Sequence, residues 1–380
     1  MRIAMLGTRG IPARYSGFET AVENLAARFA ARGHEVVVYC RPHMVERRAH
    51  HAGARLVHLP TVRNKYLDTL THTAVCTVHM LARARPDAAL YFISGNTPLV
   101  PVSRLAGVPA VLQVDGLDSE RAKWPEAARA FLRACERLAP AAATVAATDS
   151  ATVADQLEAR YGRRIVAIPY GASLPDPGDS GLCARLGLEP GRFVLFVGRL
   201  VPENNAHLLT AAHRLWGGDW PLVVVGDAPY AERYTASLRR EAGPGVVFTG
   251  YLFGRGYAEL VHRAGVMCVP TEVGGTHPVI VEAMAAGAPL LVSDHAPNVE
   301  TVGDTAALFP LDGGAEALAA ALAGMIADPS RRAALGAAAA RRAARRYSWD
   351  ACADRYLALL RAARERAGVS GCGPPAGQAP

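Results

Sequence analysis

The sequence predicts an α/β protein made of two doubly wound, Rossmann-like domains that face each other across a cleft. Three observations lead to this prediction. The chain has 380 residues, which is more than one typical domain needs. Short apolar strands alternate with helical segments through both halves, as in parallel sheets that are covered on both faces. A stretch rich in Pro and Gly at residues 169–181 separates the two runs.

The first half opens with a strand at 3–6, a loop at 7–17 and a helix whose apolar residues recur at helical spacing. Further strands are predicted at 35–39, 55–59, 88–92, 109–114, 143–146 and 164–168, with helices at 67–84, 125–139 and 150–160. Ligands of doubly wound sheets bind at the carboxyl ends of strands, so the loop at 7–17 is well placed for one. The loop lacks the full glycine fingerprint and no acidic residue closes the next strand, which disfavours NAD.

The second half repeats the alternation, with strands predicted at 193–197, 222–225, 246–249, 266–269, 290–292 and 307–309. Two helices follow over 314–346. We therefore expect a first domain at 1–172, a second at 173–347, a helix at 348–366 that packs back on the first domain, and a disordered tail at 367–380.

The stretch 267–293 reads as strand, Gly-rich loop, helix and strand. Gly274 and Gly275 break the strand, and Pro278 fits the first turn of a helix. Backbone N–H groups at Gly275, Thr276 and His277 would then point outward, where they can hold an anion or a sugar hydroxyl. Glu282, one turn inside the helix, could accept hydrogen bonds from a diol.

Arg199 follows another predicted strand and could form bidentate hydrogen bonds with phosphate oxygens. An arginine in that place is, however, usually a surface residue. No Asp-x-Asp occurs, so we expect no metal and no cofactor. Asp115 lies just past the strand at 109–114 in a segment with carboxylates, an arginine and a lysine. It could belong to a polar cluster or only cap the loop.

The net charge is +7, and the excess lies in the first half, where residues 1–175 hold 22 Lys and Arg against 14 Asp and Glu. One segment carries Arg41, Arg47, Arg48, Arg55, Arg63 and Lys65. A basic face could meet an anionic membrane or a phosphate-bearing acceptor. Because the chain has only two lysines, the excess could equally reflect a GC-rich genome. Nucleic acid is disfavoured because no basic helix or aromatic platform accompanies the charge.

The seven cysteines are scattered, without a CxxC pair, which indicates reduced thiols and a cytoplasmic protein. No apolar run is long enough for a membrane span, and the N-terminal apolar run is too short for a secretory signal. We expect at most peripheral contact with the inner face of the cell membrane.

Several stretches together carry a family resemblance: GTRGIPARYSGFET at 7–20, DGLDSERAKW at 115–124, IPYG at 168–171, GRLVPENN at 198–205, FTGY at 248–251 and GGTHP at 274–278 with EAM at 282–284. As a set they resemble family 4 glycosyltransferases of the GT-B fold, retaining enzymes that use nucleotide-diphospho-sugars. The chain looks most like the bacterial branch with rhamnosyltransferases of capsule and cell-wall polysaccharide synthesis. The resemblance makes the first domain the acceptor side and the second the donor side.

The resemblance also implies roles for residues. It implies that Arg199 contacts the donor pyrophosphate, that Glu282 binds the ribose and that Tyr251 lies near the base. The implied donor-binding set is Gly198, Arg199, Asn204, Asn205, Gly250, Tyr251, Gly274, Gly275, Thr276, His277, Pro278 and Glu282. The loop that would close over the reaction centre carries Gly10, Arg14, Tyr15, Gly17, Phe18 and Glu19. Asp115 is the candidate polar group near the anomeric centre, and with Arg199 and Glu282 it makes up the catalytic set.

Two departures from the family pattern bear on donor choice. The family's lysine after the arginine is replaced by Asn204 or Asn205, and Gly274 stands where the family has the first glutamate of a pair. We interpret both as donor specialisation, with His277 as a candidate for sugar recognition. A pyridoxal phosphorylase is excluded because both lysines precede residue 124. A sugar-nucleotide epimerase and a pseudoenzyme that only binds nucleotide-sugars remain open as alternatives.

Overall fold

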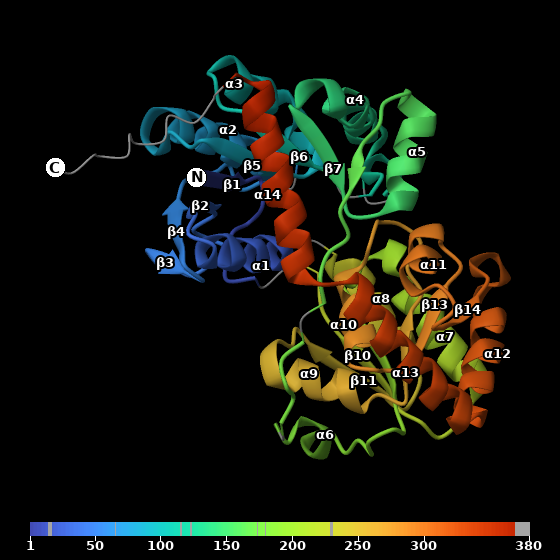
Figure 1. The fold of residues 1–380 in the computed structure, drawn as a ribbon. Helices are drawn as coiled ribbons and strands as arrows, with labels where there is room; N and C mark the ends of the chain where they lie inside the picture. Colours follow the sequence, from blue (N-terminus) through green and yellow to red (C-terminus); the bar gives the residue numbers. More distant parts are fainter. Residues whose placement is uncertain are drawn as a thin grey trace.

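The structure, a computed structural model, describes residues 1–13, 17–64, 66–114, 116–121, 124–172, 174–178, 180–228 and 231–368. The described chain forms two α/β domains, each built on a sheet with helices on its faces (Figure 1). This confirms the predicted doubly wound α/β class. The predicted disordered tail lies, from residue 369 on, outside the described residues.

The first sheet has eight strands in the order β3-β4-β2-β1-β5-β6-β7-β8. Their bounds are β1 Arg2–Leu6, β2 Glu35–Cys40, β3 His50–His51, β4 Ala54–His58, β5 Ala88–Phe92, β6 Ala110–Gln113, β7 Val145–Thr148 and β8 Val166–Ala167. All pairs are parallel except β3 with β4, and β3 is a short strand that the sequence pattern did not indicate. The order in which strands are added to the sheet reverses between β1 and β5. The end of β1 is therefore a topological switch point.

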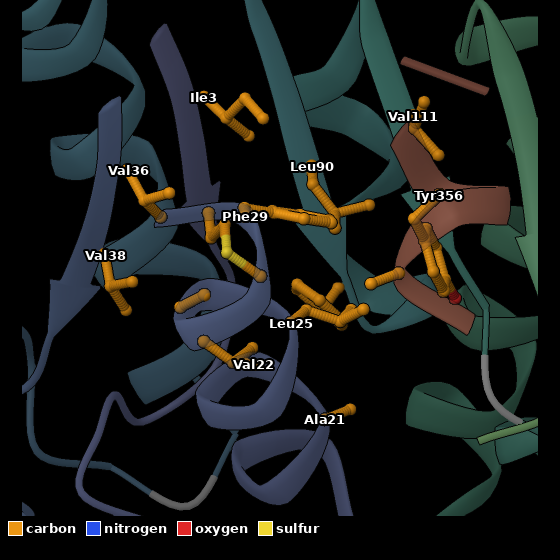
Figure 2. Packing of buried hydrophobic residues seen from close by; sticks show 14 of the residues in the cluster. Ile3, Ala21, Val22, Leu25, Phe29, Val36, Val38, Leu90, Val111 and Tyr356 are labelled. Carbon is orange, nitrogen blue, oxygen red and sulfur yellow. The ribbon is translucent and has the colours of Figure 1, made fainter. Parts of the chain in front are cut away.

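Helices cover both faces of this sheet: α1 Gly17–Ala31, α2 Asp68–His79, α3 Val100–Leu105, α4 Glu126–Ala142 and α5 Ala151–Tyr161. Short helical turns lie at η1 Met80–Ala84, η2 Ser94–Leu99 and η3 Asp118–Glu120. α1 buries Val22, Leu25 and Phe29 against strand residues such as Val36 and Leu90 (Figure 2). The 3.6-residue spacing that predicted this helix is therefore the spacing of its buried face. η2 and α3, between β5 and β6, were not predicted.

The second sheet is wholly parallel, in the order β11-β10-β9-β12-β13-β14. Its strands are β9 Val194–Val197, β10 Leu222–Val225, β11 Val246–Gly250, β12 Val266–Val269, β13 Leu290–Ser293 and β14 Ala307–Phe309. Its helices are α6 Leu182–Arg185, η4 Pro202–Asn204, α7 Ala206–Trp216, α8 Glu232–Glu241, α9 Gly254–Arg263, α10 Pro278–Ala285, α11 Ala296–Val302, η5 Leu311–Gly313, α12 Gly314–Ala327 and α13 Pro329–Arg346. The central strands are buried because helices lie on both faces, which explains their nearly continuous apolar sequences.

The last helix, α14 Trp349–Arg366, leaves the second domain and crosses the first, where it packs against α1, β5 and β6 (Figure 1). The Ser348 side chain caps it by accepting a hydrogen bond from the Ala351 N–H at 3.3 Å. At its start, Trp349 stacks on Tyr170 with ring centroids 5.9 Å apart. Further along, Tyr356 is fully buried in the core of the first domain (Figure 2). The helix therefore completes the hydrophobic core of a domain that is distant in sequence.

None of the described helices is both long enough and apolar enough to cross a membrane.

Candidate active site

A cleft of about 1300 Å³ lies between the two domains. Residues just past strand ends line it from both sides. The first domain contributes Arg9 after β1 and Asp118 after β6, and the second contributes Arg199 after β9 and Thr271 after β12. Carboxyl ends of parallel strands thus face the cleft from both sheets, the place where doubly wound sheets bind ligands.

The loop before α10 brings the two domains into backbone contact. The Thr276 hydroxyl donates to the Asp149 carbonyl at 2.8 Å. A Cβ on Gly275 would lie 2.1 Å from Asp149 Oδ1, and one on Gly116 would lie 2.8 Å from the Gly274 backbone. A Cβ at Gly116 would meet backbone and one at Gly275 would meet the Asp149 carboxylate, so only glycine fits at either position without displacement. The loop that the sequence predicted to hold an anion is therefore also the contact between the domains.

His277 explains in physical terms why a glycine stands at 274. Gly274 has φ +133°, and a Cβ there would lie 2.9 Å from the His277 ring. His295 Nε2 donates to the Gly274 carbonyl at 3.2 Å and holds the loop in this conformation. The imidazole of His277 therefore occupies the space into which a side chain at 274 would project.

The His277 imidazole is neutral. Burial, together with nearby His295, Arg121 and Arg199, lowers its pKa to about 3. Its Nε2 is buried and has no hydrogen-bond partner within the described chain. A neutral imidazole nitrogen in a polar cleft can pair with a ligand hydroxyl.

Glu282 lines the cleft and accepts a hydrogen bond from the Tyr257 hydroxyl at 2.6 Å. Burial raises the pKa of Glu282 to about 7. The hydrogen bond from Tyr257 has the opposite effect on this pKa but is the smaller of the two. Burial and the neighbouring carboxyl group raise the pKa of Tyr257 well above its usual value. Tyr257, near the start of α9, also lines the cleft, and sequence reasoning missed it.

The Arg199 guanidinium lines the cleft without a hydrogen-bond or ion-pair partner among the described residues. The asparagines at the place of the family's lysine support this region instead. Asn204 Nδ2 donates to the Arg199 carbonyl at 2.8 Å, and Asn205 Nδ2 donates to the Pro270 carbonyl at 3.0 Å. Asn204 lines the cleft, whereas Asn205 is buried beneath it. These amides position the loop that carries Arg199. They therefore have a structural function, whereas a lysine at either position would add a positive charge.

Arg121 is a second guanidinium of the cleft, contributed by the first domain. Its Nε donates to Asp118 Oδ1 at 2.8 Å, and its Nη1 lies 3.9 Å from Oε1 of Glu203 in the second domain. Glu203 is fully buried, so this ion pair joins the two domains in a poorly solvated place. Sequence reasoning noted an arginine in this segment but did not assign it to the site.

Several other predicted residues have distinct places in the structure. Tyr251 lines the cleft and stacks on Phe253 with centroids 6.1 Å apart. Phe18 lines it and packs edge-on against Phe92. The remaining predicted residues that line it are Gly17, Gly198, Gly275, Thr276 and Pro278.

Four predicted residues do not line the cleft. Gly250 ends β11 with φ +70°. Gly10 packs closely against Cys40, and Glu19 is buried and accepts a hydrogen bond from the Arg9 N–H at 2.9 Å. Asn205 is the fourth, because its side chain is buried beneath the cleft. Gly10 and Glu19 shape the loop after β1 from within, and whether that loop closes over the reaction centre stays a prediction.

Three further predicted residues, Arg14, Tyr15 and Asp115, lie outside the described residues. Among the residues that are described, no group of three or more His, Cys, Asp or Glu side chains is placed to hold a metal ion.

Each of the two domains matches a protein-family model. Residues 16–171 match the model described as "Glycosyl transferase 4-like domain", and residues 191–328 match "Glycosyl transferases group 1". Among curated proteins, the chain is 28% identical to alpha-maltose-1-phosphate synthase of Mycolicibacterium smegmatis, over 95% of this chain and 99% of that protein. It is also 28% identical to GDP-mannose-dependent alpha-mannosyltransferase of Mycobacterium tuberculosis, over 96% and 98% of the two chains.

Solved structures share the fold. Sucrose-phosphate synthase from Thermosynechococcus elongatus superposes with a TM-score of 0.76 at 22% identity, over 97% of this chain and 100% of that one. HepE from Anabaena, in complex with UDP-glucose, has a TM-score of 0.76 at 19% identity, over 95% and 100% of the chains. The two facing domains and the cleft between them are thus those of the GT-B fold. With a matched glycosyltransferase domain in each half, the chain is a glycosyltransferase of this fold.

Proposed function

We propose that this glycosyltransferase takes its sugar from a nucleotide-diphospho-sugar bound in the cleft and transfers it, with retention and without a metal, to a saccharide or lipid-linked acceptor. The observation that carries the proposal is Arg199, a cleft-lining guanidinium that has no partner among the described residues and whose charge acts on His277 at the N-terminus of α10. Both features favour a bound diphosphate. Two relatives support the donor class by name: one is GDP-mannose-dependent, and HepE was solved with UDP-glucose.

In the proposed mechanism the protein positions the donor and stabilises the departing charge. Arg199 and the N–H groups that begin α10 bind the diphosphate, and Glu282 accepts hydrogen bonds from the ribose hydroxyls. The leaving diphosphate assists attack on the same face, which gives retention. We assign Asp115, which lies outside the described residues, to the surroundings of the anomeric carbon.

The identity of the sugar is a separate question. The mycobacterial relatives are named for mannosyl transfer and maltose 1-phosphate synthesis, and they give the expectation of rhamnose no support. We propose a donor with a ribose nucleotide, because the role proposed for Glu282 is to accept hydrogen bonds from a vicinal diol, which deoxyribose lacks. Thermal-shift assays with GDP-mannose, UDP-glucose and dTDP-rhamnose test this, since a bound donor stabilises the folded protein. Stabilisation by dTDP-rhamnose alone would contradict the ribose proposal.

The deciding experiment compares Arg199→Ala and Glu282→Ala with Arg345→Ala, which removes an exposed arginine on α13. We expect both cleft variants to keep a native circular dichroism spectrum and to lose at least about a hundredfold in transfer, a change of about 2.7 kcal/mol. Donor affinity, measured by calorimetry, falls in both cleft variants and stays unchanged in Arg345→Ala. Normal donor affinity in both cleft variants would refute the site. Donor binding by the wild type without turnover on any acceptor would favour the pseudoenzyme.

We also propose peripheral contact with an anionic membrane, in a form corrected by the structure. Arg41, which the sequence placed on a basic face, is fully buried and pairs with Asp68 at 2.8 Å. Lys65 lies outside the described residues. The basic residues of this segment that are exposed are Arg47, Arg48, Arg55 and Arg63. Sedimentation with anionic vesicles should show binding that weakens with salt. Absence of binding at low ionic strength would rule the contact out.

A further inference from the structure

The first-domain end of the cleft has an aromatic wall. The rings of Tyr66 and Trp124 lie with centroids 6.0 Å apart and planes inclined by 48°. Tyr66 is 53% exposed, and Phe131 of α4 lines the same end and is 42% exposed. An exposed group of aromatic rings within a cleft offers flat apolar surface to the C–H face of a sugar ring.

Hydrogen bonds hold this wall in place. The Tyr66 N–H donates to Asn64 Oδ1 at 2.9 Å, and the Leu67 N–H donates to the Asn64 carbonyl at 3.2 Å. The Thr61 hydroxyl donates to the Asp68 carbonyl at 2.8 Å and so attaches the loop to the first turn of α2. Tyr66 is therefore exposed on a segment that is built into the fold, which reduces the cost of ordering it around a ligand.

A buried ion pair lines the cleft beside this wall. Arg41 Nη1 donates to Asp68 Oδ2 at 2.8 Å, and Arg41 Nη2 donates to the Thr69 hydroxyl at 3.0 Å. Two buried atoms of the pair, Arg41 Nε and Asp68 Oδ1, have no hydrogen-bond partner within the described chain. One is a donor and the other an acceptor, and leaving such groups unpaired costs free energy. A sugar carries several hydroxyl groups that both donate and accept, so it can supply a partner for each of these atoms.

Each guanidinium that lines the first-domain end of the cleft has a carboxylate beside it. Asp68 pairs with Arg41, Asp118 pairs with Arg121, and Glu19 lies 3.8 Å from Nη1 of Arg9. A carboxylate already accompanies each cation, so a dianionic phosphate gains less here than at Arg199, which has no partner in the described chain. The arrangement favours a neutral polyol over a phosphate.

The family resemblance makes the first domain the acceptor side. From these observations we infer that this end of the cleft binds a neutral sugar ring of the acceptor, which stacks on Tyr66 and Trp124 and forms hydrogen bonds through its hydroxyls with the Arg41–Asp68 pair. The inference rests on the proposed function and specifies its acceptor. Tyr66 and Asp68 would then be specificity-determining residues, although neither belongs to the donor site.

Tyr66→Ala and Asp68→Asn test the subsite, with Leu105→Ala as the control, because Leu105 is 90% exposed and lies outside the cleft. Two rates are measured with the donor selected by thermal shift: hydrolysis of the donor without an acceptor, and transfer to a saccharide acceptor. We expect both variants to raise the acceptor KM at least about tenfold, while donor KM and donor hydrolysis stay within about twofold of wild type. Equal losses in donor and acceptor KM, or an unchanged acceptor KM, would overturn the inference.

A binding experiment covers the case in which Asp68→Asn disturbs the fold. Saturation-transfer NMR is recorded with methyl α-D-mannopyranoside and methyl α-D-glucopyranoside, and inorganic phosphate and anionic vesicles are tested separately. We expect glycoside signals in the wild type and in Leu105→Ala that are lost in Tyr66→Ala. Binding of phosphate or vesicles that depends on Tyr66, without glycoside binding, would overturn the inference. In either case normal donor binding would leave the proposed function intact, so the two failures are distinguishable.

Discussion

At the scale of single residues, the pair of Glu282 and Tyr257 connects the binding site to the stability of the fold. Glu282 ionises near pH 7 in the folded protein because burial disfavours its charge, whereas its ordinary pKa is 4.5. Between these pH values the folded protein holds a proton that the unfolded chain has released. The free energy of unfolding must therefore fall as the pH rises through this window and stay low above it.

Glu282→Gln should remove this pH dependence, because glutamine carries no charge. We expect the variant to gain stability relative to wild type as the pH rises from about 5 to 7, by on the order of 2 kcal/mol. Urea unfolding followed by circular dichroism at several pH values measures the difference. Tyr257→Phe, which removes the hydrogen bond but keeps the carboxyl group, should retain the slope. A stability difference that is flat with pH would show that Glu282 is already ionised at pH 5.

At the scale of elements, the carboxylate of Glu259 attaches the segment that joins the two domains to helix α9. Glu259 of α9 is fully buried and accepts hydrogen bonds from the Ser180 hydroxyl and from the Leu182 and Cys183 N–H groups. Burial alone would raise the pKa of Glu259, but these hydrogen bonds outweigh it and lower the pKa to about 2. The ionised carboxylate thus fixes the start of α6 to α9 within the second domain.

Glu259→Gln should destabilise the protein at pH 7, because the amide accepts these hydrogen bonds less strongly. We expect a loss of about 1 to 3 kcal/mol, seen as a lower Tm in calorimetry. For a lowered pKa the stabilisation is full above the ordinary value of 4.5 and is lost as the pH falls toward 2. The difference from wild type should therefore shrink in acid. Glu158→Gln, at an exposed position of α5, is the control and should change neither Tm nor its pH dependence.

At the scale of the whole molecule, the two domains are held together by more than the linker. Glu300 of the second domain accepts hydrogen bonds from the Ser150 hydroxyl and from the Ala151 and Thr152 N–H groups at the start of α5. The carboxylate completes the N-terminus of a helix in the other domain, a favourable place for negative charge. Together with the Arg121–Glu203 ion pair and the glycine contacts, it defines the arrangement in which the cleft is formed.

Gly275→Ala should prevent this arrangement, because the added Cβ would lie 2.1 Å from Asp149 Oδ1. We expect the domains to separate and transfer activity to fall at least about tenfold, while the Tm changes little because each domain keeps its own core. Small-angle X-ray scattering would show a larger radius of gyration than wild type. Gly324→Ala is the matched control, since nothing lies within 4 Å of the Cβ it adds. Unchanged scattering and activity in Gly275→Ala would mean that the loop yields and that the contact is not required.

The sequence by itself determined the two sheets and the place of the cleft, and it predicted the donor side of the site. The reason is that strand and helix periodicity, helix-start signals and the strand-end position of Arg199 are all local patterns. It did not reveal that Arg41 is buried, that Gly10 and Glu19 face inward, or that Tyr257 reaches Glu282. Each of these depends on which segments pack side by side.

Only the tertiary structure decided how the halves of the site meet. The contact of Thr276 with Asp149 and the ion pair of Arg121 with Glu203 each join residues that are far apart in sequence. The same holds for the wall of Tyr66 and Trp124, which come from separate loops of the first domain. Periodicity cannot encode such contacts, because they arise when two independently formed sheets and their loops are brought together. The proposed donor site can therefore be predicted largely from local sequence patterns, whereas the inferred acceptor site depends on contacts that form only in the folded molecule.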